Sequence, residues 1–187
     1  MVKPFVKSIG LLGGSFDPAH KGHLAITKIA ISKLQLNKVF WVVAKKNPFK
    51  SKSFYSLSQR IKKARQISKG IKKIQVIYLD KIINSSRSID IINYLIKKKK
   101  INNIYFIIGS DNLIDFHKWK SWKKIVKLTK LVVFSRSGYD RKGKKSIVAK
   151  YLKKKLININ NKPIIISSSV LKKKCVKNNN GSKFNKK

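Results

Sequence analysis

The residues best suited to chemistry lie in one stretch, GLLGGSFDPAHKGH at residues 10–23, which holds two of the chain's three histidines. Its apolar start, closed by Gly13 and Gly14, is typical of a buried strand that enters a tight turn. A glycine turn lets the backbone approach a ligand closely, and the helix predicted after it presents unpaired N–H groups and a positive dipole end. This arrangement favours phosphate binding, although the glycines taken alone also fit an ordinary turn.

His20 and His23 stand three residues apart at the predicted start of that helix, so both side chains can face one ligand. A metal-binding pair is the alternative. However, a zincin motif requires glutamate, which the chain lacks, and no cluster of Cys, His or Asp lies near the pair. No protein metal site is therefore predicted. Beside a phosphate-binding turn, two imidazoles suit donation to phosphate oxygens, where they stabilise charge that grows in a transition state.

The chain is strongly basic, with 46 Lys and Arg against six acidic residues and a formal net charge of +40. Such a charge predicts non-specific attraction to polyanions, among them nucleotides, nucleic acids and anionic membrane surfaces. Compositional drift is the simpler explanation, because Lys, Ile and Asn are abundant together along the whole chain. The charge alone therefore indicates no specific partner.

Neither a membrane partner nor an oxidising compartment is expected. The longest apolar runs, such as 104–108 and 131–134, fall far short of the ~20 residues that cross a bilayer. The first apolar run continues directly into the glycine motif, which a cleavable signal would remove. Cys175 is the single cysteine, so no disulfide can form within the chain. We therefore expect a cytoplasmic protein; the sequence indicates no oligomeric state.

Apolar runs alternate with helical patterns along the chain, which predicts an α/β fold. Runs that are apolar on both faces are typical of a parallel sheet with helices on both faces, which binds ligands at the carboxyl ends of its strands. We predict one domain over residues 1–176 and a disordered basic tail at 177–187. The predicted strands are 9–12, 39–44, 74–79, 104–108, 131–134 and 163–166, and the predicted helices are 23–34, 57–68, 88–98, 119–128, 144–155 and 168–176.

Five segments, in order along the chain, resemble motifs of the nicotinate-nucleotide adenylyltransferases in the HxGH nucleotidyltransferase superfamily. GGSFDPAHKGH resembles the opening signature of that family. The resemblance covers about residues 9–172 and implies a Rossmann-like nucleotidyltransferase fold. The other four matches are NPFK at 47–50 to an N-P-L-K loop, IIGSDN at 107–112 with FHKW at 116–119 to a G-A-D…W stretch, RSG at 136–138 to R-P-G, and ISSSVLK at 166–172 to ISS-T-x-I-R.

The resemblance implies that ATP reacts with nicotinate mononucleotide to give deamido-NAD (nicotinate adenine dinucleotide) and pyrophosphate, in NAD biosynthesis. In this family the phosphate of the mononucleotide attacks the α-phosphorus of ATP, so no protein nucleophile is needed. Catalysis then rests on alignment and charge stabilisation. Mg²⁺ is the expected cofactor, because it arrives with ATP and is held largely by phosphates and water.

Carried over motif by motif, the resemblance implies that ATP lies against two distant parts of the chain. The backbone of the glycine turn would hold it, the two histidines would donate to its phosphates, and Asp111 would accept from a ribose hydroxyl. The serine run would cap a late helix whose N–H groups bind the β- and γ-phosphates. Lys172 replaces the family's arginine, keeping the charge but losing the bidentate fork. The implied ATP-binding residues are Gly13, Gly14, Ser15, Phe16, His20, His23, Lys50, Gly109, Asp111, Ser167, Ser168, Ser169 and Lys172, of which His20, His23 and Lys172 are the catalytic candidates.

For nicotinate mononucleotide the resemblance implies contacts from Ser88, Trp119 and Arg136. Ser88 aligns with a family threonine near the nicotinate carboxylate, Trp119 would stack on the nicotinate ring, and Arg136 would contact the phosphate. Structural alternatives stay open for several of the residues in the two substrate sets. They are core packing for Trp119, a surface position for Arg136, and helix capping for Asp111 and for the serine run.

Three other functions also stay open. Phosphopantetheine adenylyltransferase has similar opening and serine motifs, but it lacks the G-[AS]-D-N…W stretch and usually opens with a single glycine. A basic nucleic-acid-binding protein on the same scaffold would explain the charge, although the lysines are spread along the chain rather than gathered with aromatics. An inactive homologue is the third, and the intact histidines and Asp111 argue against it.

Overall fold

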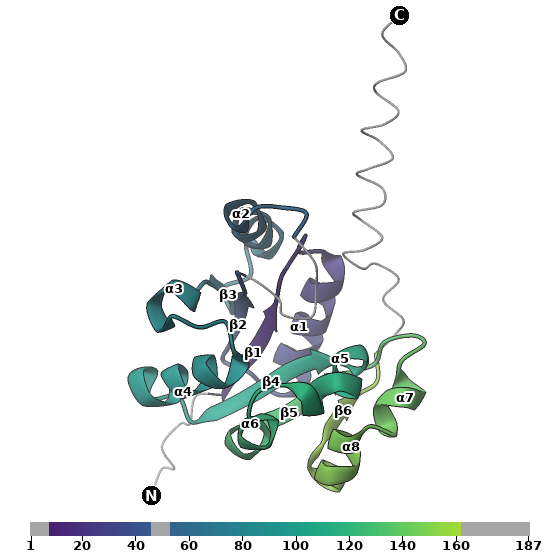
Figure 1. The fold of residues 1–187 in the computed structure, drawn as a ribbon. Helices are drawn as coiled ribbons and strands as arrows, with labels where there is room; N and C mark the ends of the chain where they lie inside the picture. The colour runs from purple at the N-terminus through teal and green to yellow at the C-terminus, as the bar shows by residue number, and fades with distance from the viewer. Residues whose placement is uncertain (1–7, 46–52, 162–187) are drawn as a thin grey trace, which may run out of the picture.

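The computed structural model describes residues 8–45 and 53–161, whose centre is a six-stranded sheet (Figure 1). All neighbouring strands are parallel, in the order β3-β2-β1-β4-β5-β6. The order reverses between β1 and β4, and sheets of this kind bind ligands outside the carboxyl ends of the strands at that point. The strands are β1 (Ser8–Gly14), β2 (Lys38–Val43), β3 (Ile74–Ile77), β4 (Asn103–Gly109), β5 (Lys130–Phe134) and β6 (Ile157–Ile159).

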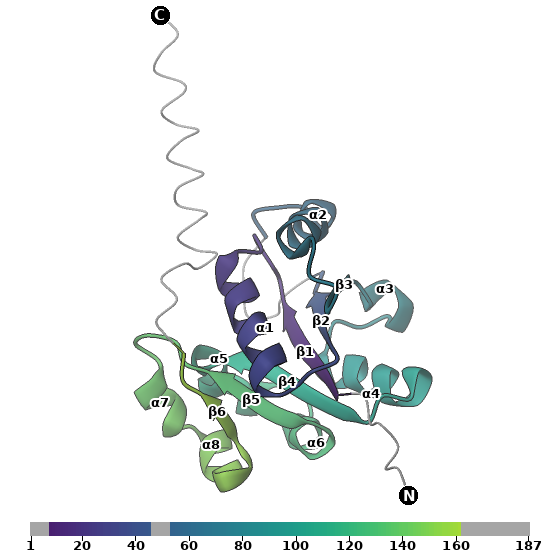
Figure 2. The ribbon, with the colours of Figure 1, turned by 180° about the vertical axis from the view of Figure 1, so that it is seen from behind.

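Helices cover both faces of the sheet, as predicted. α1 crosses the face of the sheet that is turned towards the viewer in Figure 2. α2 packs on the apolar side chains of that same face. α4 and α6 cover the other face. The helices are α1 (Lys21–Lys33), α2 (Leu57–Ser68), α3 (Asp80–Ile83), α4 (Ser88–Lys99), α5 (Ser110–Asp115), α6 (Trp122–Leu128), α7 (Asp140–Lys144) and α8 (Ile147–Leu152), with the 3₁₀ turns η1 (Phe116–Lys118) and η2 (Lys153–Lys155).

The sheet divides the core into two apolar layers, because successive side chains of a strand point to opposite faces. In β1, Leu11 joins the layer beneath α4 and α6, whereas Leu12 joins the layer beneath α1 and α2. The adjacent strand β4 divides in the same way between Phe106 and Ile107. Burial on both faces explains the continuous apolar runs, so the predicted parallel sheet is confirmed.

The boundaries of several predicted elements differ from those observed. The helix at 57–68 has the predicted bounds, whereas α3, α5, α7 and β6 were not predicted. The helix predicted at 119–128 is wrong in its first turn. It begins at Trp122, because Ser121 before it adopts a left-handed φ of 55°. The helix predicted at 144–155 is too long, since α8 ends at Leu152 and Lys153 has a φ of 48°.

The third strand is also shorter than predicted. It ends at Ile77 rather than at residue 79, and Asp80 begins α3 soon after it. The predicted strand at 163–166, helix at 168–176, domain end at 176 and tail at 177–187 all lie outside the described residues. None of the described helices is long and apolar enough to cross a bilayer.

Candidate active site

The glycine turn joins β1 to α1, and the two histidines form a reciprocal cap at the start of that helix. His20 is the N-cap, and its Nδ1 accepts a hydrogen bond from the Gly22 N–H at 3.1 Å. The Nδ1 of His23 accepts from the His20 N–H at 3.3 Å, and the two ring centroids lie 4.0 Å apart. A neutral imidazole has one accepting and one donating nitrogen, so the cap assigns the proton of each ring to Nε2.

His20 is held in its neutral form. Burial, with a smaller contribution from the positive charge of Arg136, lowers the pKa of His20 from 6.5 to about 4. At pH 7 the ring therefore keeps an accepting nitrogen for the helix and a donating nitrogen for a ligand. β1 pairs in parallel with β4, and β4 pairs in parallel with β5, so the turn after β1 and Arg136 after β5 both lie at the carboxyl edge of the sheet.

The backbone of the turn is open beside its glycines. Gly13 is exposed, and Gly14 and Ser15 are half-buried. A Cβ built on Gly13 would meet no atom within 4 Å. Open space beside glycine at the carboxyl end of a strand suits a phosphate that lies against backbone N–H groups.

Aromatic packing fixes the second histidine. Phe16 has a φ of 46° and a side chain that is only 2% exposed. Its ring stacks on Trp41 with centroids 5.2 Å apart and lies 4.8 Å from the ring of His23. Trp41 Nε1 donates to Thr27 Oγ1 at 2.8 Å, and this hydroxyl donates to the carbonyl of His23 at 2.7 Å. The ring of Phe16 is thus buried beneath the turn and is not available to a ligand.

Asp111 and Arg136 form an ion pair across the ends of β4 and β5. Their side chains are 23% and 47% exposed, respectively. The helix-cap alternative for Asp111 is wrong, because the N-cap of α5 is Gly109 and Asp111 lies within the first turn. A Cβ on Gly109 would stand 2.5 Å from Asp111 Oδ1, so glycine lets the carboxylate lie close to the strand end. The two residues that the resemblance assigns to different substrates are here partners.

Trp119 and Ser88 lie on the face of the sheet that α4 and α6 cover. Trp119 is half-buried, with its ring 4.9 Å from that of Phe116 and edge-on to Phe106 at 6.2 Å. Part of this ring therefore belongs to the core, as the packing alternative expects. Ser88 begins α4, next to a polar hollow lined by residues 83–87 and 90.

Five of the implied site residues lie outside the described residues, namely Lys50, Ser167, Ser168, Ser169 and Lys172. The described part of the site is thus the turn after β1 together with the ends of β4 and β5. The open glycine backbone, the histidine pair and the Asp111–Arg136 ion pair thus lie at the same edge of the sheet, where the strand order reverses.

Three buried charged residues next to the turn were not identified from the sequence: Arg60, Asp17 and Asp80, which are 2%, 3% and 8% exposed. Two features of the sequence could have identified Arg60. Arginine fills only five of the chain's 46 Lys and Arg positions, and Arg60 lies at helical spacing with Leu57 and Ala64 on the apolar face of α2. An arginine kept at a buried position in so lysine-rich a chain indicates a need for its planar fork of donors.

Residues 11–174 match the cytidylyltransferase-like family. A protein of Pelagibacter ubique (strain HTCC1062), named probable nicotinate-nucleotide adenylyltransferase, is 48% identical over 166 residues, which are 88% of this chain and 92% of the relative. A protein of the same name from Bradyrhizobium sp. (strain ORS 278) is 36% identical over 129 residues, which are 68% of this chain and 67% of the relative.

Solved structures show the same fold. The nicotinic acid mononucleotide adenylyltransferase of Plasmodium falciparum, complexed with NaAD, has a TM-score of 0.71 and 21% identity, over 89% of this chain and 83% of that one. The same enzyme complexed with APC gives equal values. These matches confirm the Rossmann-like fold, while the sequence relatives define the family. The chain therefore belongs to the cytidylyltransferase-like family and, within it, to the nicotinate-nucleotide adenylyltransferases.

Proposed function

We propose that this chain, a nucleotidyltransferase of NAD biosynthesis, joins the adenylyl group of ATP to nicotinate mononucleotide. A phosphate oxygen of the mononucleotide attacks the α-phosphorus of ATP. The bond from that phosphorus to the oxygen bridging to the β-phosphate breaks, pyrophosphate leaves, and nicotinate adenine dinucleotide is formed. The names of the sequence relatives and the NaAD complex of the Plasmodium enzyme support this reaction.

The observation that carries the proposal is the histidine pair at the open turn. The cap holds both rings in place through Nδ1, which leaves Nε2 as the donating nitrogen of each. Donors that are already aligned need no reorganisation when negative charge develops on the α-phosphate oxygens. One such donor is worth roughly 100-fold or more in rate. The first-turn N–H groups of α1 add the positive end of a helix dipole.

Arg136 and Asp111 exchange partners when the substrates bind. A partly exposed ion pair is worth about 1 kcal/mol or less, so a substrate phosphate can replace the carboxylate on the guanidinium. Arg136 then holds the phosphate of nicotinate mononucleotide, which is the nucleophile. Asp111, released beside Gly109, accepts from a ribose hydroxyl of ATP.

The remaining contacts rest on the resemblance and on the position of each residue. The outer part of the Trp119 ring stacks on the nicotinate ring, and Ser88 lies near its carboxylate. Lys50 contacts the phosphates of ATP. The leaving β- and γ-phosphates are held by the serine run and by the catalytic Lys172, that is, by residues 167–169 and 172.

Mg²⁺ enters this proposal as part of the ATP complex. Among residues 8–45 and 53–161, no group of three or more His, Cys or Asp side chains is placed to hold a metal ion. Mg²⁺ usually keeps several waters and binds substrate phosphates, so these residues fit an ion held by ATP rather than by a protein cage. When bound, the ion neutralises charge on the triphosphate.

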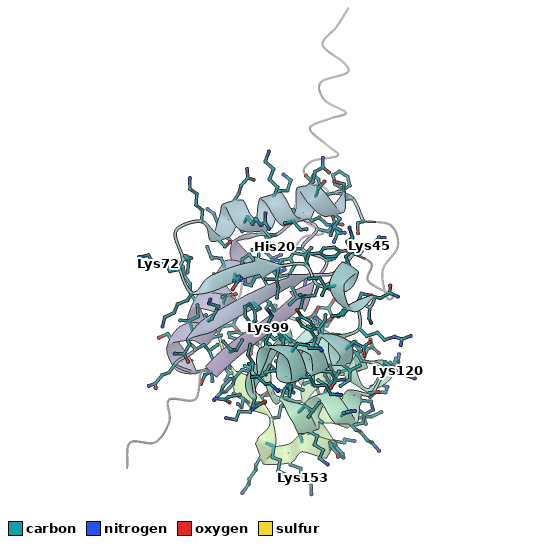
Figure 3. The ribbon with its side chains drawn as sticks, turned by 90° about the vertical axis from the view of Figure 1, so that its left-hand side faces the viewer. His20, Lys45, Lys72, Lys99, Lys120 and Lys153 are labelled. Carbon is teal, nitrogen blue, oxygen red and sulfur yellow. The ribbon has the colours of Figure 1, made fainter. Side chains whose placement is uncertain are left out.

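The reaction is assigned to the cytoplasm, with ATP and nicotinate mononucleotide as partners. Polyanions are expected to bind only non-specifically. Lys72, Lys99, Lys120 and Lys153 project from well-separated parts of the described structure (Figure 3), which fits a charge that is spread over the surface rather than gathered in one strip.

An acceptor competition tests the proposed function. The purified chain is given MgATP with nicotinate mononucleotide, nicotinamide mononucleotide or phosphopantetheine, and the dinucleotide products and pyrophosphate are quantified. We expect adenylylation of nicotinate mononucleotide. Adenylylation of phosphopantetheine alone would assign the chain to the other adenylyltransferase class. Salt-dependent RNA binding without turnover would favour a nucleic-acid-binding protein.

A further inference from the structure

We propose that Arg60 is a positioning residue for the nucleotide-binding turn, because its buried guanidinium fastens the backbone that follows β1 to the backbone that follows β2. The inference rests on the proposed function for the identity of the nucleotide. It concerns a residue that touches no substrate in that proposal. Its effect on ATP would therefore be transmitted through the protein.

The guanidinium donates to three backbone carbonyls from two strand ends. Nη1 donates to the carbonyl of Ser15 and to that of Ala44, both at 2.7 Å. Nη2 donates to the carbonyl of Lys45 at 3.0 Å. Ser15 lies directly after the glycine pair, so Arg60 holds the segment that would lie against the phosphates.

Arginine alone among side chains suits this arrangement. Its planar, rigid fork carries five N–H donors, whereas lysine offers donors around a single nitrogen. Arg60 is 2% exposed, so water cannot readily replace the bonds it makes. Loss of the guanidinium would leave the carbonyls of the half-buried Ser15 and Ala44 without this donor, and the turn would shift to satisfy them.

Two buried aspartates complete the support. Asp80 Oδ2 accepts the Lys45 N–H at 2.7 Å, next to the carbonyl that Arg60 holds. Asp17, within the glycine motif, accepts the N–H groups of Phe54 and Tyr55 at 2.9 Å each. Burial lowers the pKa of Arg60, and the charges of these two carboxylates oppose that effect. Burial also raises the pKa of Asp80, which the Lys45 N–H bond and the charge of Arg60 oppose. The guanidinium and the two carboxyl groups therefore offset part of the cost of each other's burial, and each holds backbone.

The path from this support to the chemistry is short. Ser15 precedes Phe16, whose ring stacks on Trp41 and lies 4.8 Å from the ring of His23. A shift of the backbone at Ser15 would therefore move both the glycine backbone and the ring beneath the histidine. Misplacement of about 1 Å in such a site can cost about 100-fold in rate.

The test compares Arg60→Lys, Arg60→Met and the control Arg65→Met. Arg65 is on the same helix but exposed, so its loss removes an equal charge without removing the support. Circular dichroism and thermal melting establish folding. Calorimetry then measures ATP affinity with Mg²⁺ present, and steady-state assays measure kcat and both KM values. Arg60→Lys keeps the charge beside Asp17 and Asp80, and it carries the test if Arg60→Met does not fold.

We expect the Kd for ATP to rise about tenfold in Arg60→Met and about threefold in Arg60→Lys, in keeping with loss of the fork and retention of the charge. The KM for nicotinate mononucleotide should stay within about twofold, and Arg65→Met should match the wild type. A residue that only stabilises the fold would reduce the active fraction without changing ATP affinity of the folded protein, and that result would overturn the inference.

The two proposals fail in different ways. If the wild type binds ATP but does not adenylylate nicotinate mononucleotide, the proposed function is wrong, and the role of Arg60 is still decided by ATP affinity. If the wild type performs the reaction and folded Arg60 variants bind ATP as tightly as it does, only the inference is wrong. A wild type that binds no ATP would contradict both.

Discussion

The turn after β1 and the ends of β4 and β5 hold their charged groups in different ways. Beneath the turn, Arg60 and Asp17 are almost fully buried and bond to backbone groups. At the ends of β4 and β5, Arg136 and Asp111 bond to each other and remain partly exposed. A buried charge bonded to backbone fixes geometry before a substrate arrives, whereas a partly exposed pair can exchange partners. We therefore propose that the first region serves alignment and that the second serves substrate exchange.

The largest effect is expected at the aligned region. His23→Ala removes one donor beside the α-phosphate, and kcat should fall roughly 100-fold or more, which is about 3 kcal/mol of transition-state stabilisation. His117→Ala is the matched control, because His117 bonds to the Ile114 carbonyl within α5–η1 and has no proposed role. Steady-state assays compare the two variants. Equal rates for His23→Ala and the wild type would remove that histidine from the chemistry.

The next largest effect is expected on the free energy of unfolding, when the buried carboxylate of Asp17 is replaced. Asp17→Asn replaces a carboxylate that accepts two N–H groups with an amide that accepts at one atom only. The free energy of unfolding should fall by about 2 kcal/mol. Asp115→Asn serves as the control, because Asp115 pairs with Lys118 in an exposed i,i+3 bridge, worth about 0.5 kcal/mol or less. Urea titration measures both changes, and equal losses would show that burial gives Asp17 no special weight.

A smaller effect is expected from the Asp111–Arg136 pair, on the KM for nicotinate mononucleotide alone. Arg136→Gln should raise the KM for nicotinate mononucleotide about tenfold, equivalent to about 1.4 kcal/mol, because it removes a charged partner of the attacking phosphate. Stability should change by less than about 0.5 kcal/mol, since the ion pair is partly exposed. Kinetics and urea titration are measured on the same preparation. A large loss of stability with unchanged KM would make the pair structural.

The smallest effect is expected on the pKa of His20, which lies in the first region and is lowered in part by Arg136 in the second. NMR titration of His20 should give a pKa near 4. Arg136→Gln should raise this pKa but leave it below 6.5, because burial is the larger cause of the shift. Unfolded His20 takes up its proton first as the pH falls. The stability that depends on the neutral ring is therefore present above pH 6.5 and is lost progressively between 6.5 and about 4. A pKa of 6.5 in the folded wild type would contradict this electrostatic link.

The sequence predicts the parts of the fold that depend on local pattern. The apolar runs at β1 and β4 are buried on both faces, and the bounds of α2 follow from its helical pattern. The six-residue α5 and three-residue β6 are too short to produce a periodic signal.

In the candidate site, too, the sequence predicts what is local and misses what joins distant segments. The glycine turn and the histidine pair are adjacent in sequence, so their types and spacing point to a phosphate site. Arg60 is 45 positions away from Ser15 and 16 positions away from Ala44 in the sequence. Only the folded sheet brings the carbonyls of these two residues together at its guanidinium. The Asp111–Arg136 pair likewise depends on the pairing of β4 with β5, which local pattern does not specify.

The most direct measurement is a crystal structure of the chain with a non-hydrolysable ATP analogue. We expect Nε2 of both His20 and His23 to lie within about 3.2 Å of phosphate oxygens beside the glycine turn. We also expect Asp111 to contact the ribose rather than Arg136. A triphosphate bound away from the turn, or imidazoles more than about 4 Å from every phosphate oxygen, would contradict the proposed role of the histidine pair.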